Sequence, residues 1–220
     1  MNLKSNANKI NRRDFFKTAG IGATALAIKP DMLFSRNMKR NRKVRIGIIG
    51  GRFGLGFQFQ NHPDCIVEAV SDLIPERRND LIRTYRCSKS YESLEKLVKD
   101  PKVDAVFIAT GAPDHARHVI ASLKAGKHVL CAVPAAMTID ECHEILETVK
   151  KTGLKYMMAE TSVWRQRMIS VKQFYKEDAF GNFIGFAAQY NHPGLETLYF
   201  ENGEKTWRHG LPPMLYPTHC

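Results

Sequence analysis

The sequence lacks the cysteine patterns that mark zinc sites and disulfide frameworks. It has five cysteines, an odd number, and none of them forms a C-x-x-C pair. It also lacks internal repeats, low-complexity tracts and an apolar run long enough to span a bilayer, since residues 19–28 are too short. We therefore expect neither a metal site nor a disulfide-stapled domain, and we expect Cys65 and Cys131 to be small core residues.

Most of the chain has no excess of positive or negative charge. The net charge of +11 is concentrated in residues 1–43, which hold 11 Lys/Arg against 2 Asp/Glu. Residues 44–220 hold 22 against 20 and are nearly neutral. A nucleic-acid partner is therefore not expected.

Residues 1–43 have the features of an export leader. Arg12 and Arg13 precede the short apolar run, and a basic, polar linker follows over residues 29–43. This pattern resembles a twin-arginine (Tat) signal, with Asn11 where Ser or Thr is usual. We expect export to the periplasm by the Tat machinery. Because no A-x-A cleavage site follows Ile28, the leader is a candidate membrane anchor.

A glycine-rich turn follows the first β-branched run, Val44–Ile49. Strand, glycine turn and helix N-terminus form the arrangement that holds a pyrophosphate in α/β proteins. Arg52 and Leu55 stand where the G-x-G-x-x-G template has glycine, so a purely structural turn is the alternative. The candidate cofactor-binding residues here are Gly50, Gly51, Arg52, Phe53 and Gly54.

An acidic residue, Asp72, ends the second apolar run 22 residues after Gly50. At this offset a carboxylate accepts hydrogen bonds from the ribose hydroxyls of NAD. It would repel a 2′-phosphate, so NAD is favoured over NADP.

Strand and helix patterns alternate along the middle of the chain, which predicts a doubly wound parallel sheet with ligands at the carboxyl ends of its strands. Predicted strands cover residues 44–49, 66–71, 103–109, 128–131, 154–158 and 182–190. Predicted helices cover residues 54–61, 75–84, 90–99, 113–125, 139–151 and 163–177, and Thr138 is predicted to cap the fifth. We expect His62, His118 and His143 at the surface, and Met137, Met157 and Met158 in the core.

Several of these segments together resemble the glucose–fructose oxidoreductase / inositol dehydrogenase (Gfo/Idh/MocA) family. They are residues 44–56, 72–77, 108–115 and 125–130. The resemblance implies a Rossmann domain over residues 44–158, followed by the start of an α/β domain with an open antiparallel sheet over residues 159–220. It implies NAD-dependent oxidation of a sugar, cyclitol or polyol, in a homo-oligomer. Thr110, His115, Val133 and Pro134 then become candidate cofactor contacts, with helix capping as the alternative for His115.

One position departs from the family's dehydrogenases, which carry Glu-Lys-Pro where this chain has Ala132-Val133-Pro134. Val133 has no titratable group and cannot transfer a proton. The segment from Val133 to Thr138 is instead similar to NAD-dependent α-N-acetylgalactosaminidases of the same fold. By that resemblance, transient oxidation at C3 drives elimination and hydration of the glycoside.

The glycosidase resemblance names further candidates. The catalytic ones are Tyr190, His192, Tyr216 and His219, and the substrate-binding ones are Glu160, Trp207 and Arg208. Three classes stay open: an exported dehydrogenase of carbohydrates, a redox glycosidase, and a non-catalytic nucleotide- or sugar-binding relative. The chain ends just after His219, and residues 159–220 are few for a sheet domain, so we expect an incomplete second domain.

Overall fold

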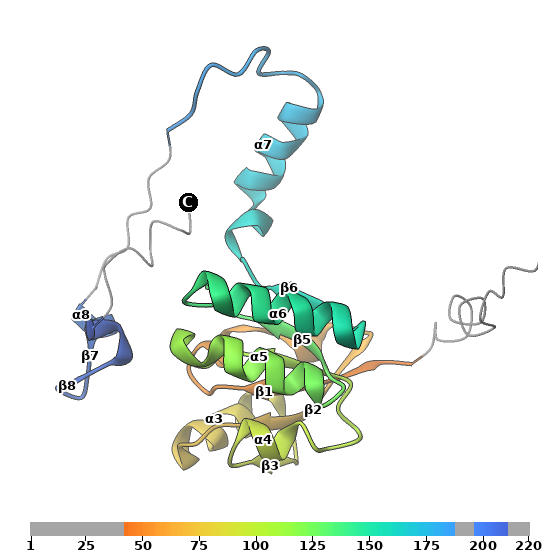
Figure 1. Cartoon of the computed structure of the whole chain (residues 1–220), viewed down its shortest axis with the longest axis vertical. Coiled ribbons are helices and arrows are strands. Elements are labelled where there is room, and N and C mark those ends of the chain that lie inside the picture. Colours follow the sequence, from red (N-terminus) through yellow and green to blue (C-terminus); the bar gives the residue numbers. More distant parts are fainter. Residues whose placement is uncertain (1–41, 188–195, 211–220) are drawn as a thin grey trace, which may run out of the picture. The chain divides into compact units, whose positions relative to one another are not determined.

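The structure is a computed structural model and describes residues 42–187 and 196–210. Its main body is a six-stranded parallel sheet with strand order β3-β2-β1-β4-β5-β6 (Figure 1). The strands are β1 (Val44–Ile49), β2 (Cys65–Ser71), β3 (Ser90–Tyr91), β4 (Ala105–Ile108), β5 (His128–Cys131) and β6 (Tyr156–Met158). The connecting helices are α3 (Pro75–Tyr85), α4 (Leu94–Leu97), α5 (His115–Lys124) and α6 (Ile139–Thr152). The predicted doubly wound α/β sheet is confirmed.

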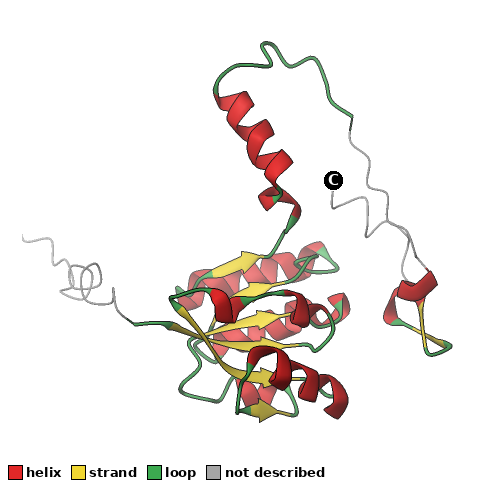
Figure 2. Ribbon diagram, turned by 180° about the vertical axis from the view of Figure 1, so that it is seen from behind, coloured by secondary structure: helices red, strands yellow, loops and turns green. Residues whose placement is uncertain are grey.

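A separate apolar core covers each face of this sheet, and Figure 2 shows helices on both sides of the strands. Along β4, Val106 and Ile108 join the cluster that includes residues of α4, α5 and α6. Phe107, which points the opposite way because side chains alternate along a strand, joins the cluster that includes residues of α3. The strands are thus buried on both faces, as their continuous apolar runs predict.

The crossover from β1 to β2 differs from the prediction, because residues 54–61 form no α-helix. They contain two 3-10 turns, η2 (Phe53–Gly56) and η3 (Phe59–Asn61). Aromatic packing covers the sheet instead: the ring of Phe57 lies 4.4 Å from that of Phe107, centroid to centroid, and Phe59 lies 5.3 Å from it. The Tyr85 hydroxyl contacts the main-chain oxygens of Gly54 and Phe57, which ties the segment to α3.

Two helix starts show how local capping sets the boundaries. The helix predicted over residues 90–99 begins at Leu94, since Ser90 and Tyr91 pair with β2 and Ser93 caps the helix. The prediction for α6 is confirmed, because Thr138 and Glu141 form a capping box in which each side chain accepts from the other's main-chain N–H.

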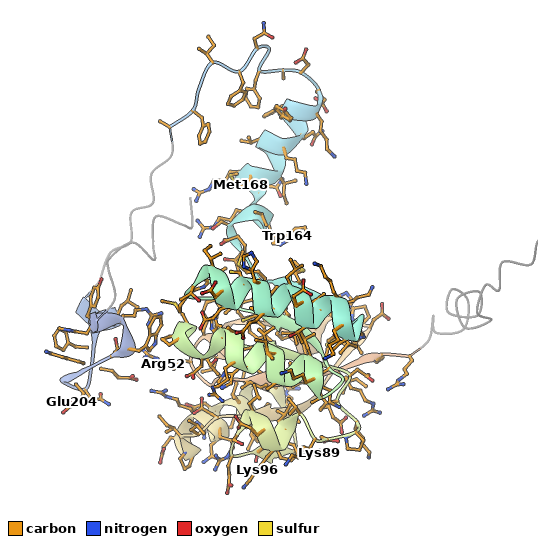
Figure 3. All side chains as sticks on the ribbon, viewed as in Figure 1. Arg52, Lys89, Lys96, Trp164, Met168 and Glu204 are labelled. Carbon is orange, nitrogen blue, oxygen red and sulfur yellow. The ribbon has the colours of Figure 1, made fainter. Side chains whose placement is uncertain are left out.

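Beyond β6 the chain has little buried surface. Helix α7 (Gln166–Lys176) follows the turn η5 (Ser162–Trp164) and has no buried residue. Figure 3 labels two exposed side chains of this region, Trp164 in the turn and Met168 in the helix. Met157 and Met158 are 49% and 39% exposed, so their assignment to the core is wrong.

The strand predicted for the second domain is not found in the described residues. Residues 182–187 form no strand, and the rest of the strand predicted over 182–190 lies outside the described residues. Helix α8 (Glu196–Tyr199), an antiparallel pair β7 (Phe200–Glu201) and β8 (Glu204–Lys205), and a turn η6 (Trp207–Gly210) complete the described chain.

Candidate functional site

The strand order reverses between β1 and β4, so the loops after these two strands border the crevice where doubly wound sheets bind ligands. Gly50, directly after β1, has a φ of +104°. A Cβ at this position would stand 2.4 Å from the main-chain oxygen of Ala109, directly after β4. Only glycine allows both this backbone conformation and this approach, which explains why the sequence places it here.

The next glycine brings the turn against α3. A Cβ on Gly51 would stand 2.7 Å from the Arg77 Cβ and 2.7 Å from the Arg77 main-chain oxygen. A Cβ on Gly54 would stand 3.2 Å from Ile48, so this glycine also packs closely on the sheet. Phe53, between them, is 49% exposed. Gly51 and Gly54 therefore let the turn pack closely on α3 and on the sheet, whereas Phe53 offers an apolar surface to solvent.

Asp72 is held rigidly at the carboxyl end of β2. Its Oδ2 accepts a hydrogen bond from the Gly51 main-chain N–H at 2.6 Å, and its Oδ1 accepts one from the Ile74 N–H at 2.8 Å. Each carboxylate oxygen has further acceptor capacity, which suits a pair of vicinal hydroxyls. The predicted ribose contact and the glycine turn thus form one connected unit, although they are 21 residues apart in sequence.

Two guanidinium groups beside the turn converge on one carboxylate. Arg52 Nη1 lies 2.9 Å from Glu201 Oε2, and Arg77 Nη2 lies 2.7 Å from Glu201 Oε1. Arg52 was singled out from the sequence, but Arg77 was missed, since α3 brings it to the turn only through the close contact at Gly51. This pair can bind an anion, because arginine donors match carboxylate and phosphate geometry.

His115 links the loops that follow β4 and β5. Its side chain is almost fully buried, with Nδ1 2.6 Å from the Pro134 main-chain oxygen and Nε2 3.0 Å from that of Thr110. Both partners are carbonyl oxygens, which only accept, so a neutral His115 ring donates to one of them and a protonated ring to both. Val133 and Pro134 are half-buried in the same loop, where Val133 supplies no acid or base. The predicted cofactor contacts in these two loops are thus brought together, and the direct contact of His115 with the cofactor stays a prediction.

His118 is buried, so its expected place at the surface is wrong. Its Nδ1 lies 2.9 Å from Thr110 Oγ1 and its Nε2 lies 2.8 Å from Arg117 Nη2. Burial, and then the positive charge of Arg117, lower the pKa of His118 below its ordinary value of 6.5. The helical spacing of residues 115 and 118 on α5, which puts both on one face toward the sheet, was the signal available in the sequence.

Of the remaining candidates, the three substrate-binding residues lie in the described part of the chain and the four catalytic residues do not. Glu160 Oε1 accepts from the Ser162 N–H at 2.8 Å, and the Arg208 guanidinium lies 4.2 Å from the Trp207 ring centroid. The Trp207 indole nitrogen lies 3.2 Å from the point where a Cβ on Gly111 would stand. The four predicted catalytic residues lie outside the described residues: Tyr190, His192, Tyr216 and His219.

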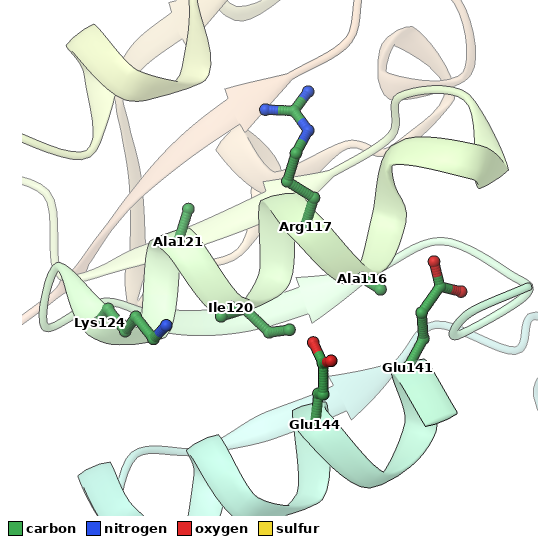
Figure 4. A pocket seen from close by; sticks show the side chains of 7 residues that line it. All are labelled: Ala116, Arg117, Ile120, Ala121, Lys124, Glu141 and Glu144. Atoms are coloured by element: carbon green, nitrogen blue, oxygen red, sulfur yellow. The ribbon is translucent and has the colours of Figure 1, made fainter. Parts of the chain in front are cut away.

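The outer side of the helices carries a shallow pocket of about 410 Å³ between α5 and α6, lined in part by Lys124, Glu141 and Glu144 (Figure 4). All of its lining residues belong to these two helices and none to the loops that follow the strands, and Glu141 is already engaged in the capping box. We therefore assign it no role in ligand binding. Among the described residues, no three His, Cys, Asp or Glu side chains are grouped to hold a metal ion. Within the same residues, no helix has the length and apolar character needed to cross a membrane.

Comparison with known proteins agrees with this geometry. A Glycosyl hydrolase family 109 protein of Solibacter usitatus is 29% identical over 96% of this chain and 54% of its own length. A myo-inositol 2-dehydrogenase of Thermotoga maritima is 33% identical over 50% of this chain and 34% of its own. The chain thus spans about half the length of the first relative, and half of the chain matches about a third of the second.

A solved structure has the same fold. Scyllo-inositol dehydrogenase from Lactobacillus casei, with bound NAD(H) and scyllo-inositol, superposes with a TM-score of 0.60 over 64% of this chain and 43% of its own, at 20% identity. Residues 44–160 also match the family described as "Oxidoreductase family, NAD-binding Rossmann fold". These residues hold the glycine turn, Asp72 and both loops tied by His115. The chain belongs to this family, the Gfo/Idh/MocA oxidoreductases, whose Rossmann domain binds NAD.

Proposed function

We propose that this chain is the nucleotide-binding part of an NAD-dependent oxidoreductase that acts on a sugar or polyol. The observation that carries the proposal is the unit formed by Gly50, Gly51 and Asp72. Gly50 packs against the loop after β4, and the Gly51 N–H fixes the Asp72 carboxylate at the end of β2. When bound, NAD supplies a hydride acceptor. The residues of this chain orient it: Asp72 holds the adenosine ribose, and the loops after β4 and β5 border its other half.

The first test is nucleotide affinity, measured by isothermal titration calorimetry with NAD and NADP. We expect Asp72→Ala to weaken NAD binding at least about tenfold, because hydrogen bonds to a charged group contribute about 1.5–3 kcal/mol and about 1.4 kcal/mol corresponds to a factor of ten. NADP binding should weaken less, because the same substitution removes repulsion of the 2′-phosphate. Asp64→Ala, which removes an exposed carboxylate from the loop before β2, is the control and should leave both affinities unchanged. Equal losses for NAD and NADP would refute the ribose assignment.

The arginine pair supports the phosphate side of the same proposal. Arg52 and Arg77 already share one carboxylate, Glu201, which shows that both guanidiniums reach one anion at the turn. The β1–β2 crossover has no α-helix whose N-terminus would face a pyrophosphate. Guanidinium charge is a substitute for that helix terminus in stabilising the phosphates.

A second candidate, a glycosidase with a recycled NAD, is favoured by Val133. This half-buried side chain stands in the loop after β5 and cannot take the proton of a hydroxyl that is being oxidised. The protein would be purified without added cofactor, denatured and assayed for released NAD(H). Stoichiometric NAD without net reduction supports the glycosidase, whereas reduction of added NAD⁺ by a sugar panel supports the dehydrogenase. A non-catalytic relative would show no turnover in either assay.

Export and assembly belong to the same proposal. Arg12 and Arg13 support passage through the Tat machinery, and residues 1–41 lie outside the described residues. A fusion of residues 1–43 to a reporter should reach the periplasm, and replacing both arginines by lysine should hold it in the cytoplasm. Secretion that is unchanged by this substitution would refute the route. The proposed homo-oligomer is tested by light scattering on the purified protein, where a monomeric mass would contradict it.

A further inference from the structure

A directed series of hydrogen bonds runs from the surface of α5 to Thr110, in the loop after β4 that borders the crevice. Arg117 Nη2 lies 2.8 Å from His118 Nε2, and His118 Nδ1 lies 2.9 Å from Thr110 Oγ1. A guanidinium only donates, so His118 Nε2 is the acceptor and its ring proton resides on Nδ1. His118 therefore donates to the Thr110 hydroxyl oxygen.

The two ends of this series of hydrogen bonds, Arg117 and Thr110, are fixed by different contacts. At the surface, Arg117 also bonds Glu95 and Asp114, each at 3.1 Å, and these carboxylates orient the guanidinium. At the crevice, the Thr110 main-chain oxygen is bonded by His115 Nε2 at 3.0 Å. The backbone and the side chain of Thr110 thus each lie within hydrogen-bond distance of a histidine of α5. Burial, and then the Arg117 charge, lower the pKa of His118, which agrees with a neutral ring.

The direction of these bonds decides what Thr110 can offer to a ligand. Its oxygen accepts from His118, so its own hydrogen is not used in that contact. Thr110 is half-buried and follows β4, on the side of the reversal point opposite to Asp72. In doubly wound sheets the two sides of this point bind the two nucleotide halves of a dinucleotide.

We propose that Thr110 donates a hydrogen bond to an acceptor oxygen on the nicotinamide half of NAD, with Arg117 and His118 as positioning residues that set its direction. This inference rests on the proposed function, since it names a contact within the same nucleotide site. It assigns the cofactor contact to the side chain of Thr110 and gives the buried His118 a role in ligand recognition.

The first experiment reads the direction of the bonds without any ligand. Long-range ¹H–¹⁵N NMR on the ¹⁵N-labelled chain should show His118 as the Nδ1–H tautomer. In Arg117→Ala, which lacks the donor to Nε2, this preference should be lost. An Nε2–H tautomer or a doubly protonated ring near neutral pH would overturn the proposed relay.

The second experiment compares NAD with AMP, which has only the adenosine half, by calorimetry. Thr110→Val should weaken NAD by roughly three- to tenfold, the range for loss of one hydrogen bond of about 0.5–1.5 kcal/mol, and leave AMP unchanged. Thr110→Ser and His118→Gln should bind NAD within about twofold of the wild type, because serine keeps the hydroxyl and glutamine keeps an acceptor and a donor. His118→Phe should weaken NAD, and His143→Gln, at an exposed position of α6, is the control.

The outcomes separate this inference from the proposed function. If the wild type binds NAD and Thr110→Val binds it equally well, the inference is wrong and the nucleotide site stands. If Thr110→Val weakens NAD and AMP by the same factor, the contact is not on the nicotinamide half and the inference is again wrong. If the wild type binds neither nucleotide, the proposed function is wrong, and so is the assignment of NAD as the ligand of Thr110. The tautomer measurement still decides the direction of the hydrogen bonds in that case.

Discussion

At the scale of single residues, the site depends on positions where one chemical group is the only one that fits. Gly50 is an example, because its φ of +104° and its approach to Ala109 both exclude a side chain. At His118 the requirement is looser, because any side chain there that accepts from Arg117 and donates to Thr110 meets it. We therefore expect every substitution at Gly50 to be costly, whereas His118 should tolerate glutamine and not phenylalanine.

We expect Gly50→Ala to lower the free energy of unfolding by more than about 1 kcal/mol, since alanine is strained at positive φ and its Cβ would clash with the next loop. Gly56→Ala is the matched control, because no atom lies within 4 Å of the added Cβ. Urea unfolding followed by circular dichroism measures both. Similar midpoints for the two variants would contradict the close packing of the turn.

The pH dependence of stability should report His118. Its pKa is lowered in the folded chain, so the unfolded chain takes up the proton first as the pH falls below about 6.5. The contribution of His118 is therefore present above this pH and is lost as the pH falls toward the folded-state pKa. His118→Gln should flatten the decrease in unfolding free energy between pH 7.5 and pH 5.5, and His143→Gln should not. A decrease that is the same in His118→Gln and in the wild type would rule His118 out as its source.

At the scale of elements, two local devices hold the framework of the site. The capping box of Thr138 and Glu141 begins α6, which follows the loop that holds Val133 and Pro134. The aromatic group of Phe57, Phe59 and Phe107 covers the sheet where the predicted helix is missing. Hydrogen bonds at a helix end are local and readable in sequence, whereas the aromatic packing joins residues about 50 positions apart.

For the capping box, Thr138→Ala should destabilise the protein by about 1 kcal/mol, the usual cost of losing an N-cap side chain. Thr148→Ala is the control, because this exposed hydroxyl only donates to the Glu144 carbonyl within the same helix. Thermal unfolding of both variants gives the comparison. A loss in Thr148→Ala as large as that in Thr138→Ala would argue against a role for the cap.

For the aromatic group, Phe57→Ala should cost about 2–4 kcal/mol, because it removes a partly buried ring from a packed cluster. Phe53→Ala should cost less than half as much, since Phe53 is 49% exposed and its ring centroid lies 5.1 Å from that of Phe57, at the edge of the cluster. Denaturant midpoints of the two variants measure the difference, and equal losses would contradict the view that packing replaces the helix.

At the scale of the whole molecule, the buried cores belong to the sheet and its helices. Both clusters of buried residues lie between Ile46 and Ala159, and α7 contributes no buried side chain to either. The stability of the described chain should therefore reside in residues 43–160, with only a small contribution from α7 and the other described elements beyond Glu160.

A chain truncated after Glu160 should accordingly unfold in one cooperative transition, with a free energy of unfolding within about 0.5 kcal/mol of the longer chain, as for changes away from buried contacts. Equilibrium unfolding in urea, followed by both fluorescence and circular dichroism, is the measurement. Loss of cooperativity in the shorter chain would show that residues after 160 complete the core.

The sequence by itself determined the alternation of strands and helices, the glycine turn, the cap of α6 and the place of Asp72, because each depends on neighbours within a few positions or on a fixed offset. Tertiary structure decided the rest. Residues 54–61 form no α-helix, since aromatic contacts with Phe107 satisfy the sheet's face instead. His118 is buried against Thr110 and Met157 is exposed because burial depends on which elements lie alongside, and that information is distributed over the whole chain.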